Sequence, residues 1–573
     1  MTTSSENVLE ACQTLVGSNV AYHPLIELAQ TQADALFRKW CLSWREGTEL
    51  ESAIALLETT LHLAEMLPNV EPAVLAKLLR PQGNYRQESL FRQGRKVDAD
   101  EAARCLLKVL QYEPWNFIVM ADLSWICLYQ NDVTGSRRPL DDAIEFIENA
   151  LAIIPADHEK FSAVLRVAAM SLIKRAQFDG CNQDLDMASH LLRAGLSLPH
   201  LYQDDHALLR LLLAHVHLLR FESSESFEDL NEAEILIGQT ATEFTVNVQH
   251  EAYRNELRGR MFQTRWKYLR TRDDLTESFS EYVAMNKAID GSSASPSCIK
   301  NSVRLRRADL LRLSYHQYCT DMLLSRAYNF AKEACTVAKI RASEWHVSGI
   351  SGVEAEGLFI MGEVQRSRHE RFGATSLLDD AVSSFRQSAQ MTEQKDADFA
   401  ERASALSAIL RKRSKADHTN AYQRRADLYE ARHWVGKMIL SRLPLRRRDH
   451  VDCVLEIGHV LWDSGGPVDR VIPLYQHAVD LDTMDFVNRV QSWRSLAQAL
   501  ISRGRNTRNT DDLATAGTYL NMVEKLEQEK DSRSTGRLPV VADLQSAYYE
   551  LTVSDSRSSN ECMPPYSPHF MSI

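Results

Sequence analysis

Pairs of neighbouring aspartates are the residues whose type and spacing first suggest chemistry in this chain. Asp141 and Asp142, followed by Glu145, carry the kind of carboxylates with which an all-helical prenyl-diphosphate enzyme holds magnesium. Similar pairs recur near the starts of other helical segments, at Asp273–Asp274, Asp379–Asp380 and Asp511–Asp512. Carboxylates at a helix start also cap its free N–H groups and face the positive end of the helix dipole. Because the pairs repeat, we interpret them as N-caps and expect no metal site and no cofactor.

Two other patterns resemble nucleotide and metal sites. Gly436 and Lys437 approach a Walker A loop, but Met438 replaces the Ser or Thr that binds magnesium, and no strand precedes the motif. His215 and His217 are two residues apart, so on a helix they point about 200° away from each other and cannot bind one metal ion. The sequence therefore indicates no nucleotide site and no histidine metal site.

The 10 cysteines are scattered singly, without a C-x-x-C pair, which excludes a zinc finger or a disulfide scaffold by spacing. Cys105, Cys127 and Cys335 fall in apolar helical stripes, where we expect them to be buried in the core. A cysteine protease would also need an α/β domain, for which the sequence shows no strands. We therefore predict no catalytic residues and no enzymatic activity.

Basic side chains are the remaining candidates for a functional site. Residues 1–250 carry 20 Lys and Arg against 35 Asp and Glu, whereas residues 401–450 carry 13 against 5. A local basic patch on an acidic protein attracts an acidic partner. The residues predicted to bind a partner are Arg260, Arg304, Arg307, Arg366, Arg411, Lys412, Arg413, Arg424 and Arg425. Because the net charge is −11 and no aromatic platform is interleaved with the patch, nucleic acid is not expected as a partner.

The elements that must position these side chains repeat along the chain. A small anchor residue recurs at intervals of 40 to 54 residues, at Ala53, Ala102, Ala143, Ala188, Ala233, Ser278, Ala327, Ala381, Ala431, Val471 and Ala516. The residue four positions after each anchor is apolar in all eleven cases, as expected on one face of a helix. A second apolar run of helical period precedes each anchor helix. The sequence therefore predicts an all-α, right-handed solenoid of about eleven helical hairpins with a period of about 46 residues.

The array is predicted to occupy residues 24–528. Residues 1–23 are expected to be an N-terminal extension or capping segment. Residues 529–553 are expected to form a linker and a possible capping helix, and residues 554–573 are expected to be a disordered tail because of their polar, proline-broken composition. No segment has the basic start and apolar core of a signal peptide, and no apolar run reaches the ~20 residues that cross a membrane. We expect a cytoplasmic protein, with a nuclear location left open.

Two anchor helices carry a resemblance to a known family. The segments concerned contain Ala143, Ile147, Ala150 and Pro155, and Ala102, Leu106, Val109 and Pro114. Their spacing resembles the second helix of a tetratricopeptide repeat. The whole pattern resembles the long, degenerate arrays of fungal proteins that often precede a caspase-like CHAT protease domain, although no CHAT domain follows here. The chain departs from the family because no unit has the full W-x2-L-G-x2-Y signature and the period exceeds the usual ~34 residues.

The function predicted from these features is a non-enzymatic scaffold or adaptor. Its concave face, lined by the first helix of each hairpin, would bind a peptide or protein partner, and the basic patch favours an acidic one. One alternative is a regulatory or sensor arm of a signalling complex whose effector lies on another chain. A second alternative is an all-helical enzyme of specialised metabolism with an unrecognised site.

Overall fold

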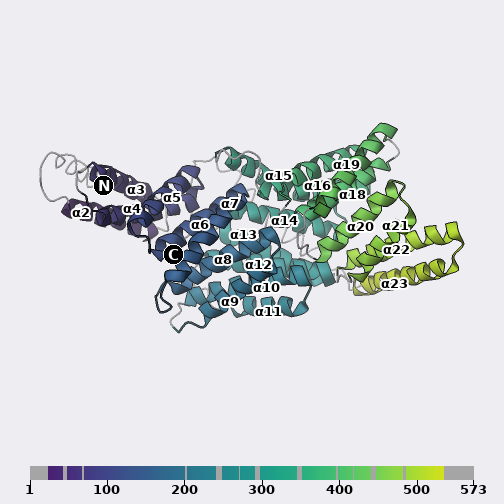
Figure 1. Cartoon of the computed structure of the whole chain (residues 1–573), viewed down its shortest axis with the longest axis horizontal. Coiled ribbons are helices and arrows are strands. Elements are labelled where there is room, and N and C mark those ends of the chain that lie inside the picture. Colours follow the sequence, from purple (N-terminus) through teal and green to yellow (C-terminus); the bar gives the residue numbers. More distant parts are fainter. Residues whose placement is uncertain are drawn as a thin grey trace.

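The computed structural model describes residues 23–42, 48–66, 70–199, 203–240, 248–269, 272–290, 297–344, 352–394, 396, 398–416, 419–440, 447–481 and 485–534. Within these ranges it contains 22 α-helices and no strand (Figure 1). The predicted all-α fold class is confirmed. The helices are α2 His23–Leu42, α3 Glu49–Glu65, α4 Pro72–Gln93, α5 Lys96–Tyr112, α6 Phe117–Thr134, α7 Arg137–Ile153, α8 Phe161–Asp179, α9 Asn182–Leu196, α10 Gln203–Ser224, α11 Phe227–Gln239, α12 Val248–Leu269, α13 Arg272–Asp290, α14 Ser297–Tyr318, α15 Asp321–Glu344, α16 Gly352–Phe372, α17 Thr375–Gln390, α18 Phe399–Ser414, α19 Ala421–Leu440, α20 Arg447–Asp463, α21 Val468–Asp480, α22 Phe486–Thr507 and α23 Thr510–Ser534.

The helices form the eleven predicted hairpins. Each even-numbered helix packs along the odd-numbered helix that follows it, from α2 with α3 to α22 with α23. We call these the first and second helices of a hairpin. All eleven anchor residues lie on second helices, and every one of them is fully buried, with an exposed fraction of 0%. The repeat read from the sequence is therefore the packing repeat of an α-solenoid.

The turn between the two helices has a constant geometry in seven hairpins. A residue with positive φ ends the first helix eight positions before the anchor: Gly94, Gly135, Gly180, Glu225, Cys319, Gly373 and Arg508. In this left-handed conformation the residue's N–H reaches a carbonyl of the last helical turn, as Gly135 does to Asn131. Glycine adopts it without steric cost, which explains four of the seven positions. A fixed turn length sets the register between the two helices and hence the position of the anchor.

The apolar residue four positions after the anchor completes the core of each hairpin. It is at most 6% exposed in ten hairpins, whereas Leu520 in the last hairpin is 41% exposed. Four of these residues, Leu106, Tyr282, Phe385 and Tyr475, pack directly against glycines of the first helix. A Cβ built on Gly458 would lie 2.5 Å from the ring of Tyr475, and one on Gly83 would lie 2.7 Å from Leu106. These glycines are needed because the two helix backbones approach closely at these points.

The curvature of the solenoid follows from which helices touch. Successive first helices are in contact at most junctions, as in α8 with α10, α14 with α16 and α18 with α20. In the part of the chain that the structure describes, no comparable contact joins two successive second helices. First helices therefore form the inner, concave face and second helices the outer face. Contacts also join α6 to α15 and α16, and α12 to α22, so first helices five hairpins apart meet (Figure 1).

The predicted N-caps need correction. Helix α7 begins at Arg137 and its N-cap is Ser136, because the tight turn at Gly135 starts the helix earlier than expected. Asp141 lies inside the first turns and accepts a hydrogen bond from Arg137 Nε at 2.7 Å. The four aspartate pairs do not share one position either. Asp273–Asp274 and Asp511–Asp512 lie five and four positions before their anchors. Asp141–Asp142 and Asp379–Asp380 lie two positions and one position before theirs.

An aspartate four residues before the anchor instead holds the two helices of a hairpin together. It is found in six hairpins, as Asp98, Asp184, Asp229, Asp274, Asp427 and Asp512. Asp512 accepts two hydrogen bonds from Arg503 on the first helix, at 2.7 and 2.8 Å, and Asp184 accepts two from Arg175, at 2.7 and 2.6 Å. His217 takes the place of the arginine opposite Asp229. We call this contact the hairpin clamp.

The predicted domain limits are only partly covered by these residues. The helices of the array run from His23 to Ser534, close to the predicted array of 24–528. The predicted extension 1–23, apart from His23, lies outside the described residues. The predicted capping helix after residue 534 and the predicted tail 554–573 also lie outside them. The limits stay predictions.

Candidate functional site: polar side chains of the inner face

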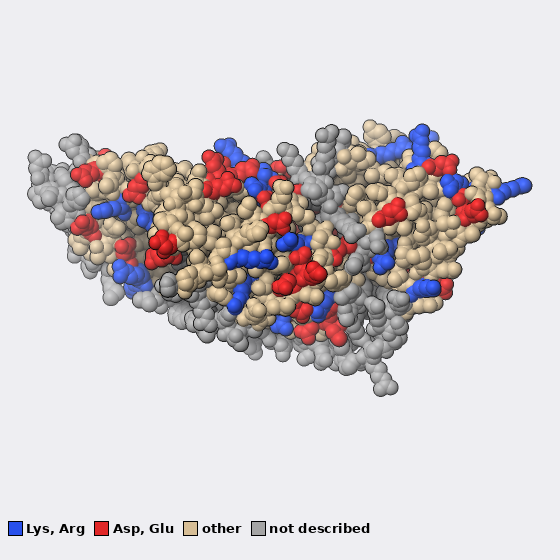
Figure 2. Space-filling view, turned by 60° about the horizontal axis from the view of Figure 1, so that its bottom comes forward, with Lys and Arg blue, Asp and Glu red and all other residues tan. Residues whose placement is uncertain are grey.

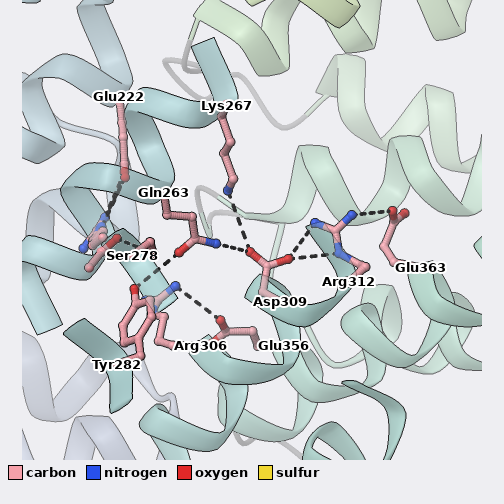
Figure 3. A network of polar contacts seen from close by, with 12 residues as sticks. Glu222, Gln263, Lys267, Ser278, Tyr282, Arg306, Asp309, Arg312, Glu356 and Glu363 are labelled. Carbon is pink, nitrogen blue, oxygen red and sulfur yellow. Dashed lines mark hydrogen bonds and ion pairs between the residues drawn. The ribbon is translucent and has the colours of Figure 1, made fainter. Parts of the chain in front are cut away.

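The inner face carries a group of charged and polar side chains at the centre of the array. Figure 3 shows most of this set, which comes mainly from α10, α12, α14 and α16. We call it the central polar network. Its members are Glu222, Arg260, Gln263, Lys267, Tyr282, Arg306, Asp309, Arg312, Glu356, Glu363 and Arg366.

Asp309 on α14 is the most connected member of the central polar network. It accepts a hydrogen bond from Gln263 Nε2 at 2.6 Å and two from Arg312, at 3.0 and 2.6 Å. Lys267 Nζ lies 3.9 Å away (Figure 3). Burial alone would raise the pKa of Asp309, but the positive charges of Arg312 and Lys267 outweigh burial and hold that pKa well below its ordinary value. Asp309 is therefore a permanent anion that joins α12 to α14.

Two arginines of α14 face carboxylates of α16, and they differ in exposure and in the length of their ion pairs. Arg312 Nη1 lies 3.4 Å from Glu363, which also pairs with Arg366 at 2.6 Å. Arg306 has Glu356 as its nearest carboxylate, and that distance is 3.7 Å. The side chain of Arg306 is 32% exposed, whereas that of Arg312 is 13% exposed. Arg306 and Lys267 are thus the members that combine access to solvent with a long ion pair, since the side chain of Lys267 is 33% exposed and lies 3.9 Å from Asp309.

At the other end of the network, Arg260 joins α12 to α10. It donates to both carboxylate oxygens of Glu222 at 2.9 Å and to His215 Nε2 at 3.0 Å. His215 Nδ1 lies 3.0 Å from Tyr253 Oη, so the neutral ring with its proton on Nδ1 satisfies both contacts. Burial, followed by the charge of Arg260, lowers the pKa of His215 well below its ordinary value. His215 is therefore a neutral acceptor that orients Arg260.

The charges of the network nearly balance. Five cations face four carboxylates, which leaves a formal excess of +1. On the face shown in Figure 2, basic and acidic side chains are likewise interleaved along the middle of the molecule. Among the residues with coordinates that can be described, no group of three or more His, Cys, Asp or Glu side chains could hold a metal ion. The arrangement suits ion pairing and hydrogen bonding.

Comparisons with known proteins show which solved structures this fold is similar to. No family model and no curated protein sequence matches the chain. Human IFIT1, in a structure of the dimer with PPP-AAAA, shares 11% identity at a TM-score of 0.44, with 84% of this chain and 93% of that chain covered. The Rap protein complexed with competence and sporulation factor shares 12% identity at a TM-score of 0.37, covering 65% and 100%. Yeast Tom70 shares 13% at a TM-score of 0.34, covering 86% and 99%. We therefore argue function from the residues of this chain, and the likeness to fungal arrays ahead of CHAT domains stays a prediction.

The structure places seven of the nine predicted partner-binding residues on first helices, and most of them have partners within the chain. Arg260 and Arg366 belong to the central polar network. Arg304 lies 3.7 Å from Glu333, and Arg307 is buried with its guanidinium over the Phe330 ring, 4.3 Å from the ring centre. Lys412 donates to Glu370 at 2.8 Å.

Arg411 and Arg413 hold buried carboxylates. Arg411 on α18 donates to both oxygens of Glu456 at 2.7 and 2.8 Å and to Asp463 at 2.8 Å. Burial would raise the pKa of Glu456, but hydrogen bonds and charges from His459 and Arg411 lower it. Arg413 is the hairpin-clamp arginine opposite Asp427. Sequence reasoning could not foresee these pairs because Arg411 and Glu456 are 45 residues apart.

The last two predicted residues lie on the opposite side of the solenoid. Arg424 and Arg425 belong to the second helix α19 and are exposed. Arg424 donates to the Thr419 carbonyl at 3.4 Å. The nine residues therefore do not form one surface: seven contribute to the inner face or its supports, and two lie outside.

Sequence reasoning missed Arg306, Arg312 and Lys267, although each stands within six residues of a predicted arginine or of its helix's apolar stripe.

Other expectations were met. Cys105, Cys127 and Cys335 are buried, and burial raises their thiol pKa values to about 11, 12 and 12. His215 and His217 face different partners, as their spacing predicts. None of the helices described here is both long and apolar enough to cross a bilayer.

Proposed function

We propose that this protein is a non-enzymatic interaction scaffold that binds an acidic segment of a partner protein along the inner face of α12, α14 and α16. The observation that supports this proposal is the exposure of the Arg306 side chain together with its long distance from a carboxylate. About a third of its side-chain surface is exposed, and its guanidinium lies 3.7 Å from Glu356. Neighbouring arginines in the central polar network are bound to carboxylates at 2.6 to 2.9 Å.

A carboxylate from a partner can pair with Arg306 without breaking an existing short contact. A charge-assisted hydrogen bond of this type contributes about 1.5–3 kcal/mol. Arg260 and Arg366, already predicted from the sequence, lie on the neighbouring first helices α12 and α16. Because these groups stand on packed first helices, they are positioned before a partner arrives.

The test is affinity capture from the native cell with matched baits. The baits are the intact chain, Arg306→Gln, and Arg104→Gln as a control on the outer helix α5, where Arg104 pairs with Glu101 in an i, i+3 contact. We expect a partner held by the intact chain and the control to be lost at least tenfold by Arg306→Gln, since one charge-assisted contact is worth about that factor. Equal capture by all three baits, or no partner with any of them, contradicts the proposal.

Charge reversal at Arg411 and Arg413 is a poor test of this site. Each of these arginines neutralises a buried carboxylate, so their loss would destabilise the fold itself. Arg306→Gln avoids the problem because the Glu356 contact is long and partly exposed. Thermal unfolding of each bait, followed by circular dichroism, confirms that differences in capture are not differences in folding.

A further inference from the structure

The outer helix α19 carries an exposed stripe of alternating aromatic and basic side chains. Tyr422 is 83% exposed and Tyr429 is 76% exposed, the two highest values for large apolar side chains among the described residues. Arg425 and Arg432 are exposed as well. The two tyrosines are seven residues apart, and so are the two arginines. In Figure 1, α19 lies at the upper edge of the molecule.

Helical geometry places these residues on one face. At 100° per residue, Tyr422, Ala426, Tyr429 and His433 fall within a sector of about 60°, and Arg425 and Arg432 form one edge of it. The opposite face packs on the array: Ala431 is 0% exposed and Trp434 is 4% exposed. We call Tyr422, Arg425, Ala426, Tyr429, Arg432 and His433 the α19 stripe. Arg424 points away from it.

The α19 stripe carries positive charge only. The two carboxylates of this helix are used elsewhere: Asp427 is held by Arg413, and Glu430 by Arg386 at 2.7 Å. Arg425 makes no ion pair or hydrogen bond within the described part of the chain, and Arg432 donates to the neutral Ser464 hydroxyl at 2.8 Å. Exposed tyrosine with arginine is the composition that protein interfaces favour, because both bury much surface and retain a polar end.

We infer that the α19 stripe is a second docking surface, which takes an acidic amphipathic helix of a partner protein. The seven-residue spacing of both the tyrosines and the arginines matches the repeat of a helix lying alongside α19. Apolar side chains of the partner pack against Tyr422, Ala426 and Tyr429, while Asp or Glu at every seventh position pairs with Arg425 and Arg432. This surface is independent of the inner face and of the function proposed for it.

Charge decides between the possible occupants. A second copy of this chain docked through the same stripe would place Arg425 and Arg432 against their own copies, with no carboxylate to oppose them. A nucleic acid would find the two tyrosine rings about 10 Å apart along the helix, so two successive bases could not stack on both of them. The protein's net charge of −11 also disfavours a polyanion more than a short acidic helix.

The experiment places a photo-crosslinker in the stripe of the full chain. Tyr429 is replaced by p-benzoylphenylalanine, the protein is irradiated in extract of its source cells, and the crosslinked peptides are sequenced by mass spectrometry. Met187, which is 54% exposed on the second helix α9, is replaced in the same way as the control. We expect an adduct specific to position 429 whose peptide has helical periodicity and carboxylates seven residues apart.

Two paired variants test the charge requirement. Arg425→Glu with Arg432→Glu should reduce the yield of the adduct at least tenfold, whereas Arg425→Lys with Arg432→Lys should retain most of it. Both positions are exposed, so neither pair should change the unfolding temperature appreciably. Arg306→Gln should leave the adduct intact, which separates this surface from the inner-face proposal.

The inference is overturned by any of four results with the crosslinker chains and by a fifth with the charge-reversed chain. The first four are an adduct to a second copy of this chain, an adduct that nuclease removes, a partner peptide without the acidic heptad pattern, and no adduct above the Met187 control. Survival of the adduct in the Arg425→Glu and Arg432→Glu chain also overturns it.

Discussion

Asp122 on α6 is the residue whose environment departs most from the paired carboxylates elsewhere. Its side chain is buried, with an exposed fraction of 6%, and its Oδ2 atom has no hydrogen-bond partner in the part of the chain that the structure describes. Burial raises the pKa of Asp122 to about 7, although the charges of Arg80 and Lys160 act in the opposite direction. This carboxyl therefore changes its charge near neutral pH.

The first prediction concerns the pH dependence of stability. Because the pKa of folded Asp122 is raised, the folded state holds a proton that the unfolded state releases. Its contribution is fully present below about pH 4 and is lost as pH rises through about 7. In the natural sequence we expect the free energy of unfolding to fall by on the order of 3–4 kcal/mol between about pH 4 and pH 8, at about 1.4 kcal/mol per pKa unit. The Asp122→Asn variant should lack this fall. Urea unfolding at several pH values measures it.

Asp132→Asn on the same helix is the matched control, because the side chain of Asp132 is 43% exposed and pairs with Lys174 at the surface. Its pH profile should follow that of the natural sequence. Parallel profiles for Asp122→Asn and the natural sequence would show that Asp122 is ionised throughout this range.

The hairpin clamp is the contact that organises the molecule at the scale of its elements. In the α18–α19 hairpin, Asp427 is 1% exposed and accepts hydrogen bonds from Arg413 at 3.0 and 2.6 Å. Arg413 also donates to Asp379 of the preceding hairpin at 2.8 Å. One arginine thus joins two helices of its own hairpin and the hairpin before it. Such a group supports the binding surfaces and does not itself form one.

The second prediction follows from this burial. Asp427→Asn leaves the half-buried guanidinium of Arg413 with the exposed Asp379 as its remaining ion-pair partner among the described residues, which should reduce the free energy of unfolding by about 2–4 kcal/mol. Glu101→Gln, which removes the exposed partner of Arg104, should change it by less than about 1 kcal/mol. Thermal unfolding of both variants gives the comparison. Equal shifts in unfolding temperature would mean that the clamp contributes no more than a surface pair.

At the scale of the whole molecule, contacts are not limited to hairpins that are adjacent in the array. In an ideal solenoid each hairpin contacts only the next one, so local damage spreads only along the chain. Here α6 contacts α15 and α16, and α12 contacts α22. These contacts bring together helices that are five hairpins apart and couple the early part of the array to the later part.

The third prediction tests that coupling by hydrogen exchange. Phe385 on α17 is fully buried and packs against Gly362 of α16, so Phe385→Ala should destabilise this hairpin by about 3–5 kcal/mol. We expect amides of α6 to lose protection along with those of α16, whereas amides of α2 and α3 should keep theirs. If α6 behaves like α2 and α3, the contact between α6 and α16 carries no stability.

The sequence by itself determined the hairpins, because their signals are local. An anchor with an apolar residue four positions later marks the buried face of a second helix, and a second apolar run before it marks the first helix. Both signals lie within one hairpin, where helical geometry fixes which side chains meet. The eleven anchors, all fully buried, were therefore readable from the chain.

Only the tertiary structure decided which charged groups remain available. Arg411 meets Glu456 across 45 residues of sequence, and α6 meets α16 across five hairpins. These distances depend on the small rotation between successive hairpins, which accumulates along the array and leaves no periodic mark in the sequence. For that reason the sequence pointed to Arg411 and Arg425 but missed Arg306. Only the folded array shows that Arg411 is bound within the fold, whereas Arg306 and Arg425 are exposed to a partner.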